Sequence, residues 1–450
     1  MSKRLKVSLV IGWFASAVTF SAGAQAQVGD SGFEPFNSFI QRVSTAEVAS
    51  VAAAPGAKVS DAAEIERMRQ HVLSLYAGVA VSHSFVADGQ YFDCVGLTEQ
   101  PSLRALGLKS LASPPPLPPA SPAVGAIGPG GAPQALADQS RIWNGRDRFG
   151  NTQTCEAGRF SMRRVTLEEI ARFGTLRQFF QKGADGAGEF RPPGDLSPAS
   201  LAHKYAHALQ YVTNYGGSSS VNLWSPNLST IAANTNMSLS QHWYVNYTAD
   251  GSAVQTAEGG WQNLPNKYGI NKSVLFIYWT ADGYNKTGCY DLDCVGFVQY
   301  DPTLPLARAF SNYSVSGGTQ YVFQMTYELY KGNWWFGFNG HWGGYFPGKI
   351  YGTGKLAQNA SMIDYGGETV GTPTYPPMGS GAFASGGFGH SAYQALVKYY
   401  TSGTATTMKD ATLVEQQPSP TCYTDDMHDN SGVSGYSTYF FFGGPGGSGC

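Results

Sequence analysis

The chain has 450 residues, of which 13% are charged, and its formal net charge is -2. This balance offers no basic surface for nucleic acid, so the sequence excludes that class of binding protein. Glycine occurs 56 times, tyrosine 26 times and phenylalanine 25 times, which favours β-sheet with many turns over helical bundles, and the length allows two or three domains.

The first residues have the layout of a secretory signal peptide. Basic side chains precede an apolar run from Val7 to Phe20, and small residues follow. We expect cleavage after Ala24 or Ala26, so that residues 1–26 are removed. The apolar run is too short to span a bilayer. The sequence therefore predicts an exported protein, extracellular or periplasmic, without a membrane anchor.

Residues 27–195 carry most of the arginine and show helix signals. Asp61 with Glu64 resembles a capping box, and it opens a run with one apolar face. A second helix start is expected at Thr166, with Glu169 three residues later. Between the two starts, a Pro/Ala/Gly-rich tract at about 112–137 is expected to form an extended linker.

Strand patterns dominate residues 196–450. Ser273–Thr280 predicts a buried strand, and Tyr321–Tyr330 alternates before returning through residues 334–336 as a hairpin. The exception is a segment from about Ala199 to Tyr211, which we predict as a helix. The expected fold is mainly β: an antiparallel β-sandwich preceded by a smaller region that contains helices.

Six cysteines fit an exported, oxidised protein. Six cysteines permit 15 connectivities, but their distribution along the chain suggests three local pairs. No Cys-x-x-Cys motif is present, so we expect neither a zinc site nor thioredoxin-like redox chemistry. The suggested pairs are Cys94 with Cys155, Cys289 with Cys294, and Cys422 with Cys450.

Two of the four glutamates after residue 201 lie beside paired glycines. Glu258 occurs in Ala-Glu-Gly-Gly-Trp-Gln, and Glu368 occurs in Asp-Tyr-Gly-Gly-Glu-Thr. Glycine removes side-chain bulk and would let a substrate backbone approach closely. Two carboxylates that meet can share a proton and act as an acid–base pair without metal or cofactor. Spacing alone equally allows both to be surface residues at tight turns.

The other two glutamates have plainer interpretations. Glu328 alternates with apolar residues along a strand, which predicts a solvated face, and Glu415 is expected in a surface loop. Asp364 would share a strand face with Glu368, but about 13 Å away. Glu368 therefore needs a partner from another strand, and Glu258 is the best candidate by residue type.

Histidines and aspartates give weaker signals. His203 and His207 are spaced i, i+4 on the predicted helix, but no glutamate follows the first and no third ligand is apparent. We expect them on the helix surface rather than at a metalloprotease site. No Gly-x-Ser-x-Gly motif indicates a serine hydrolase. Three aspartates without EF-hand spacing leave a calcium site open: Asp282, Asp291 and Asp293.

The residues alone leave a second class of function open. The tryptophan and tyrosine side chains of a β-sandwich could stack on sugars, with the aspartates binding calcium. A glycosidase could use the same two glutamates. The alternative to a peptidase is therefore a carbohydrate-binding or carbohydrate-cleaving β-sandwich protein.

The region from about residue 198 to 450 contains a series of short motifs. They are Ser240-Gln241-His242-Trp243, Glu258-Gly259-Gly260-Trp261-Gln262, the stretch from Phe276 to Tyr284, Thr287-Gly288-Cys289-Tyr290, the stretch from Cys294 to Gln299, Asn333-Trp334-Trp335, Gly366-Gly367-Glu368, and the stretch from Phe440 to Gly446. In these motifs and their order the region resembles the neprosin family of glutamate-dependent, proline-directed endopeptidases. Through Phe92-Asp93-Cys94-Val95 and Cys155-Glu156-Ala157-Gly158, the region before it resembles the family's activation peptide.

The resemblance implies a β-sandwich catalytic domain at 196–450 with Glu258 and Glu368 as its catalytic pair, and no cofactor. It implies a pro-region at 27–195 that inhibits the enzyme in the same chain until acid maturation. The expected substrates are proline-containing peptides or proteins, cleaved after proline. We expect four residues to contact substrate: Gln241, Trp261, Trp279 and Tyr345.

Overall fold

The computed structural model describes residues 32–117, 134–135, 145–182, 203–228, 236–371, 373–404, 406–429, 431–432 and 436–450. The expected signal peptide, most of the proline-rich tract and the end of the expected pro-region lie outside the described residues. Residues from Pro35 onward form one compact unit. None of the described helices is long and apolar enough to cross a membrane.

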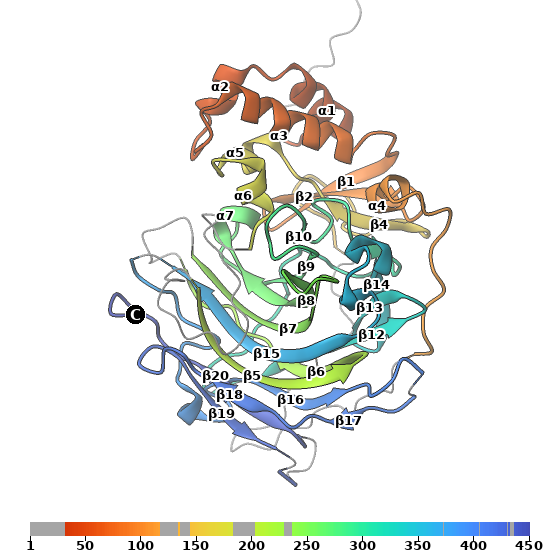
Figure 1. Ribbon diagram of the computed structural model, residues 1–450. Coiled ribbons are helices and arrows are strands. Elements are labelled where there is room, and N and C mark those ends of the chain that lie inside the picture. Colours follow the sequence, from red (N-terminus) through yellow and green to blue (C-terminus); the bar gives the residue numbers. More distant parts are fainter. Residues whose placement is uncertain are drawn as a thin grey trace, which may run out of the picture. The chain divides into compact units, whose positions relative to one another are not determined.

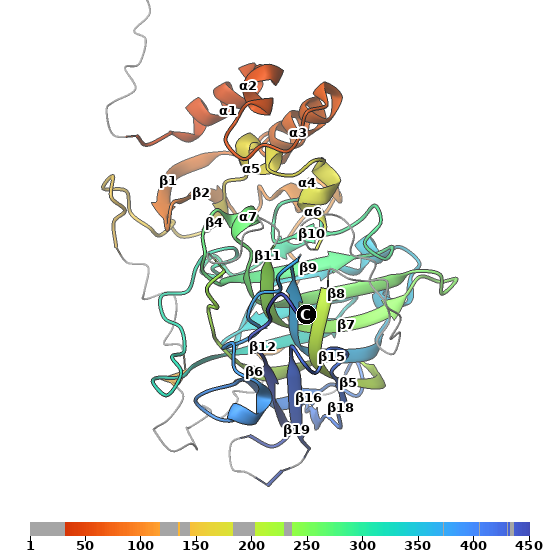
Figure 2. The same cartoon turned by 90° about the vertical axis from the view of Figure 1, so that its left-hand side faces the viewer.

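The N-terminal region, by which we mean described residues 35–182, combines helices with a small sheet (Figures 1 and 2). Its three-stranded sheet has the order β1-β2-β4. The elements are α1 (Phe36–Thr45), α2 (Val48–Ala52), α3 (Ala62–Leu75), β1 (Val81–Ala87), β2 (Gln90–Gly96), α4 (Pro101–Ala105), β3 (Gln134–Ala135), β4 (Arg159–Arg163), α5 (Leu167–Ala171) and α6 (Leu176–Phe180).

Both predicted helix starts in this region are confirmed. The Asp61 side chain caps α3 by accepting a hydrogen bond from the amide of Ala63. At α5, the hydroxyl of Thr166 accepts from the amide of Glu169. These side chains satisfy amide groups that have no partner within the helix, so the local sequence decides where each helix begins.

Two large sheets make up the sheet domain, residues 203–450 (Figure 1). One has seven strands in the order β10-β9-β8-β7-β15-β5-β18, and the other has ten, with β11-β14-β13-β12-β6-β16-β20-β19 as its main path. The seven-stranded sheet contains β5 (His203–Asn214), β7 (Met237–Tyr247), β8 (Val254–Asn263), β9 (Val274–Thr280), β10 (Cys289–Tyr290), β15 (Ala360–Val370) and β18 (Val414–Gln416).

The ten-stranded sheet is antiparallel along that path, and β3 joins β12 in parallel. It contains β6 (Gly216–Asn222), β11 (Val298–Gln299), β12 (Tyr321–Tyr330), β13 (Asn333–Phe338), β14 (His341–Pro347), β16 (Ala392–Tyr399), β17 (Lys409–Asp410), β19 (Thr424–His428) and β20 (Tyr439–Gly443). The short helices of the domain are α7 (Pro265–Tyr268), η2 (Gly348–Tyr351), η3 (Lys355–Ala357) and η4 (Ala384–Gly386).

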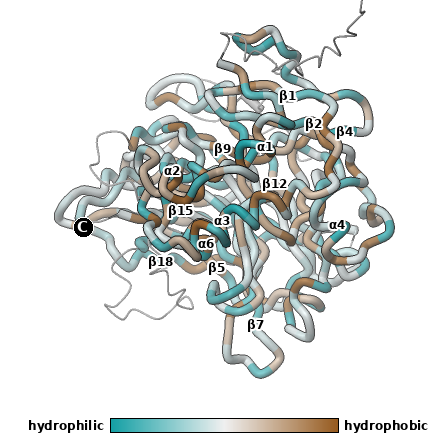
Figure 3. The backbone as a smooth tube through the Cα atoms, turned by 90° about the horizontal axis from the view of Figure 1, so that it is seen from above, coloured by the Kyte–Doolittle hydropathy of each residue, from teal (hydrophilic) through white to brown (hydrophobic). Residues whose placement is uncertain are grey.

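The sheets pack as the expected antiparallel sandwich. The predicted hairpin is confirmed, because Tyr330 of β12 pairs with Asn333 of β13. Met325 and Tyr327 lie in the same buried cluster as Trp261 of the seven-stranded sheet. Hydrophobic and hydrophilic stretches follow one another along the chain in Figure 3, and strands β7, β8 and β9 are almost entirely buried on both faces.

The helix predicted from about Ala199 to Tyr211 is wrong. Its described part is strand β5, which pairs with β15 on one side and β18 on the other. Residues four apart share a face of a strand as well as a face of a helix, so the spacing of His203 and His207 fits both structures. Pairing along both edges decides for the strand, and this contact between distant segments cannot be seen in a local pattern.

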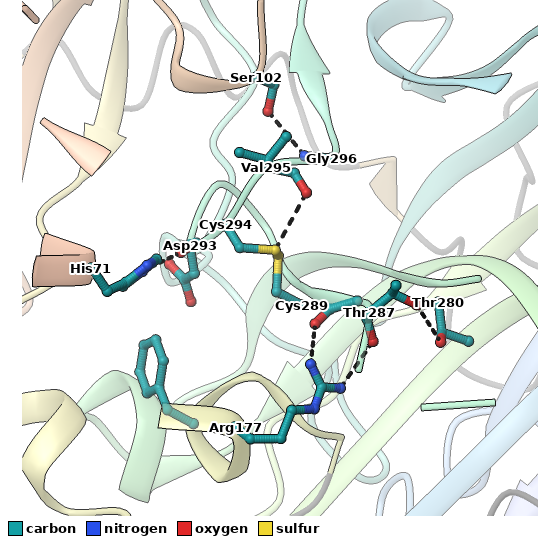
Figure 4. Close-up of a disulfide and its surroundings, with 12 residues drawn as sticks. His71, Ser102, Arg177, Thr280, Thr287, Cys289, Asp293, Cys294, Val295 and Gly296 are labelled. Carbon is teal, nitrogen blue, oxygen red and sulfur yellow. Dashed lines mark hydrogen bonds between the residues drawn. A yellow bond between two sulfur atoms is a disulfide. The ribbon is translucent and has the colours of Figure 1, made fainter. Parts of the chain in front are cut away.

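All three expected disulfides are present: Cys94–Cys155, Cys289–Cys294 and Cys422–Cys450. The Cys289–Cys294 bridge lies where the N-terminal region meets the sheet domain (Figure 4). Beside it, the guanidinium of Arg177 donates to backbone oxygens including that of Thr287, at 2.9 Å. An imidazole nitrogen of His71 lies 2.8 Å from the backbone oxygen of Asp293. Polar contacts therefore attach the N-terminal region to this loop.

A buried ion cluster strengthens the same attachment. Arg163 of β4 pairs with the carboxylate of Asp293 at 3.1 Å, and Lys267 of α7 pairs with it at 2.6 Å. Arg163 also pairs with Glu169 of α5 at 2.6 Å. Because these side chains are almost fully buried, losing one member of the cluster would leave an uncompensated charge away from water.

Candidate active site

Glu258 and Glu368 occupy the same face of the seven-stranded sheet, on strands that flank β7. In the register of the sheet, Trp243 of β7 lies opposite Glu258, and Leu239 lies opposite Glu368. Because residues two apart on a strand share a face, Gln241 lies between those two positions. The sheet thus brings together two carboxylates that are far apart in sequence.

The ammonium group of Lys182 lies between the two carboxylates. Its Nζ is 2.6 Å from Oε2 of Glu258 and 2.8 Å from Oε2 of Glu368. It also donates to Oε1 of Gln241 at 2.9 Å and lies 4.2 Å from the centre of the Trp243 ring. The lysine side chain is only 5% exposed. A single cation supplied by the N-terminal region therefore neutralises charge on two buried carboxylates.

Hydroxyl groups hold the second oxygen of Glu258. Thr256, on the same strand, donates to Oε1 at 2.6 Å, and Tyr284 donates to it at 2.6 Å from the loop after β9. Tyr327 of the other sheet donates to the backbone oxygen of Glu258 at 2.5 Å. These contacts fix the position of the carboxylate with neutral donors.

Glu368 has a different set of partners. Nδ1 of His203 lies 2.6 Å from its Oε1, and the amide of Gln241 donates to its Oε2 at 3.1 Å. Burial alone would raise the pKa of Glu368, but the Lys182 ammonium and the His203 hydrogen bond outweigh it and lower the pKa to about 2. With these partners in place, the carboxyl group of Glu368 is ionised even in acid.

A second histidine–carboxylate pair lies further along the same two strands. Nδ1 of His207 is 2.7 Å from Asp364. Burial would lower the pKa of His207, but the neighbouring Asp364 carboxylate raises it. Asp364 therefore has its own partner. The expectation that His203 and His207 lie on a helix surface is wrong, because both are buried at acidic side chains.

Two tryptophans expected to contact substrate lie on the opposite face of the sheet. Trp261 is three positions after Glu258, and its indole N–H donates to the backbone oxygen of Asn222 in the other sheet. Tyr278 is directly opposite Glu258, so the next residue, Trp279, points the other way, into the core between the sheets. An odd offset along a strand reverses the face, so neither indole lines the carboxylate site.

The two other residues that we expected to contact substrate lie in different sheets. Gln241 contacts both Lys182 and Glu368, as described above. Tyr345 lies on β14 of the ten-stranded sheet, where its hydroxyl accepts a hydrogen bond from the amide of Ala112. Of the four expected residues, only Gln241 lies beside the carboxylates.

The sequence patterns did not identify several contacts of the site. The sequence could have indicated Trp243 and Thr256. Each is an even number of positions from Gln241 or Glu258 on its strand, and such residues share a face of the sheet. Lys182 and His203 had no local signal, since their partners are distant in sequence. Tyr284 lies in a loop with no strand pattern to orient it.

Remaining acidic candidates are satisfied by protein groups. Asp291 accepts from the hydroxyl of Tyr268 at 2.9 Å, and Asp282 accepts from Thr287, while Asp293 is held by the ion cluster. Glu328 is half-buried rather than solvated, and burial raises its pKa to about 7. Glu415 is exposed as expected, although it lies on strand β18 and not in a loop.

The glycines beside the carboxylates are required by neighbouring strands. A Cβ atom on Gly260 would lie 1.9 Å from the backbone oxygen of Ser240. Gly366 has φ of +149°, and a Cβ there would lie 2.6 Å from the backbone oxygen of Ala206. We expected the backbone of a substrate to approach these glycines closely. The close approach is made instead by the backbones of neighbouring strands in the sheet.

We expect Gly366→Ala to lower the free energy of unfolding by more than about 2 kcal/mol, through the close contact and the strained backbone together. Gly332→Ala is the matched control, because Gly332 also has positive φ but has open space around it. Urea denaturation of both variants measures the difference. Equal losses would mean that the contact with Ala206 contributes nothing.

Residues 234–445 match the family model described as Neprosin. The match includes both carboxylates, Gln241 and Trp243. It begins after strand β5, so His203 and Lys182 lie outside it. This agrees with the motifs found in the sequence and indicates a neprosin-like peptidase. Residues 234–445 of the chain are therefore similar to the neprosin family.

Proposed function

We propose that this protein is an exported glutamic endopeptidase, active in acid, made as a latent precursor and directed to bonds after proline. One observation carries the proposal. Glu258 and Glu368 come from different strands, are buried on one face of the sheet, and share the ammonium of Lys182.

The chemistry follows from what would remain without the lysine. Two adjacent buried carboxyl groups do not both ionise easily, so one keeps a proton. An ionised carboxylate can take a proton from water, and a protonated carboxyl group can hydrogen-bond the carbonyl oxygen of a peptide and later protonate its nitrogen. Such a pair works best in acid.

Lys182 also supports the proposed latency. It is in the last described stretch of the N-terminal region, next to α6, and its Nζ occupies the point that both carboxylates and Gln241 can reach. Water or a peptide bond cannot occupy that point at the same time. We therefore interpret the N-terminal region as a pro-region that inhibits the enzyme within the same chain.

The preference for proline rests on the resemblance of the motifs to the neprosin family. Trp243 is consistent with this preference, because its ring lies beside the carboxylates. The ammonium nitrogen of Lys182 is 4.2 Å from the centre of that ring. A flat indole suits the ring of a proline side chain. Export is supported by the signal-like first residues and by the three disulfides.

The test uses the full-length protein, acidified to about pH 4, where a carboxyl pair would be half-protonated. It is incubated with a synthetic peptide that contains one proline, and with the same peptide carrying alanine instead. We expect mass spectrometry to show cleavage after proline only, with no effect of a chelator. Release of sugars from a polysaccharide, without peptide cleavage, would instead favour the carbohydrate-active alternative.

A further inference from the structure

We infer that the two carboxylates have fixed and different roles: Glu368 is the general base, Glu258 is the general acid, and His203 is the positioning residue that determines this order. The inference rests on the proposed function and adds to it the division of labour within the pair. His203 lies before the residues that match the family model.

The asymmetry is visible in the partners that remain once Lys182 has left. Glu368 keeps the imidazole of His203, whose Nδ1 is 2.6 Å from Oε1. In acid an imidazole carries protons on both nitrogens and is a cation. A buried cation at hydrogen-bond distance favours the ionised form of its carboxylate partner. Glu368 is therefore the member of the pair that stays negative.

Glu258 keeps only neutral partners among the contacts described for its carboxylate. They are the hydroxyl groups of Thr256 and Tyr284, both at 2.6 Å from Oε1. Its other oxygen, Oε2, is the one that faces Lys182 in the precursor. When the lysine leaves, this oxygen faces Glu368, and the single proton of the pair resides on Glu258.

Other titratable groups near Glu368 do not reverse this order. Tyr205 lies between His203 and His207 on β5, and burial keeps its pKa well above the ordinary value, so it remains a neutral phenol. His207 is paired with Asp364, and the opposite charges of this pair compensate each other. Lys182 departs with the pro-region. The cation left in contact with Glu368 is His203.

The reaction then proceeds with each proton accounted for. Glu368 takes a proton from water as the water oxygen bonds to the carbonyl carbon. Glu258 donates a hydrogen bond to the carbonyl oxygen, which becomes negative. When the C–N bond breaks, the leaving nitrogen takes the proton of Glu258. The proton held by Glu368 then passes to Glu258, so both groups return to their starting protonation states. Water and the peptide are the reactants, and no oxidant or reductant is needed for this balance.

The test measures the pH dependence of kcat/KM for acid-matured His203→Gln. Without the cation, Glu368 should hold its proton to higher pH, so the acidic limb of the profile should move up by about one unit or more. The matched control is His207→Gln, on the same strand and paired with a different carboxylate. We expect its acidic limb to stay in place.

An unmoved acidic limb in His203→Gln, or an equal movement in His207→Gln, would overturn the inference. The proposed function fails separately, if the wild-type protein does not cleave peptides. Should His203→Gln not fold, infrared titration of the two glutamate variants gives the answer. The carboxyl signal that is lost in Glu368→Gln relative to wild type should titrate at lower pH than the signal that is lost in Glu258→Gln, and the reverse order would also overturn it.

Discussion

Replacing Glu368 by Gln is expected to lower kcat for peptide hydrolysis by roughly 10²–10⁴-fold, the usual contribution of a general acid or base. Glutamine has nearly the same shape, and its one amide oxygen can still accept from Gln241 or from His203, but it cannot take a proton from water. Glu258→Gln should cause a loss of similar size. The measurement is the initial rate on a proline-containing peptide in acid, after maturation with a wild-type sample.

The control for both variants is Glu415→Gln, which makes the same chemical change at an exposed position on β18. It should retain full activity. If Glu368→Gln kept more than about a tenth of the wild-type rate, a general base worth 10²-fold or more would be excluded at that position. The peptidase would then have to use another group, and the role of the buried pair would be structural.

Replacing Lys182 by Met is expected to release the pro-region more easily. The variant keeps most of the side chain's length and loses its charge, so it loses charge-assisted hydrogen bonds to two carboxylates. Such bonds contribute about 1.5–3 kcal/mol, which corresponds to maturation roughly ten to a hundred times faster. The appearance of the shortened chain on a gel, followed over time at fixed pH, measures this rate.

The same contact predicts how maturation of the wild-type precursor depends on pH. The pKa of Glu368 is lowered from 4.5 to about 2 while its partners are in place. A lowered carboxyl pKa means that the contact stabilises the precursor fully above pH 4.5 and is lost as the pH falls toward 2. Maturation should therefore accelerate over that window.

Lys182→Met should weaken this pH dependence, because it removes a cation that lowers the pKa of Glu368 in the precursor. The matched control is Lys109→Met, which removes an exposed lysine of the same region. A Lys182→Met precursor that matures at the rate of the Lys109→Met precursor would show that the lysine does not maintain latency. The pro-region would then be held by its other contacts, such as the ion cluster at Asp293 and the hydrogen bonds of Arg177.

Much of the fold is predictable because its signals are local. Asp61 and Thr166 mark helix starts through their own side chains. The turn after Tyr330 and the alternation before it specify a hairpin. The segment around His203 fails as a local prediction, because alanine-rich sequence with i, i+4 histidines fits both a helix and a strand, and pairing with β15 decides.

The site is predictable only in part, for a related reason. Glycine context and residue type identify Glu258 and Glu368, but nearness in sequence to Glu258 points to Trp261, which strand parity places on the other face. Counting in steps of two from Glu258 would have excluded Trp261, since it is an odd number of positions away. Lys182 reaches the carboxylates from a separate region, and no periodicity within β8 or β15 could indicate it.

The position of His203 at the first residue of β5 sets a limit on processing of the chain. Lys182 and His203 lie on either side of residue 195, where the expected pro-region ends, and both contact Glu368. A cut within residues 183–202 detaches the blocking lysine and leaves the histidine on the product. An exopeptidase that removes His203 from the new amino terminus would also remove the imidazole that contacts Glu368, so excess trimming would move the acidic limb of the product's pH profile upward.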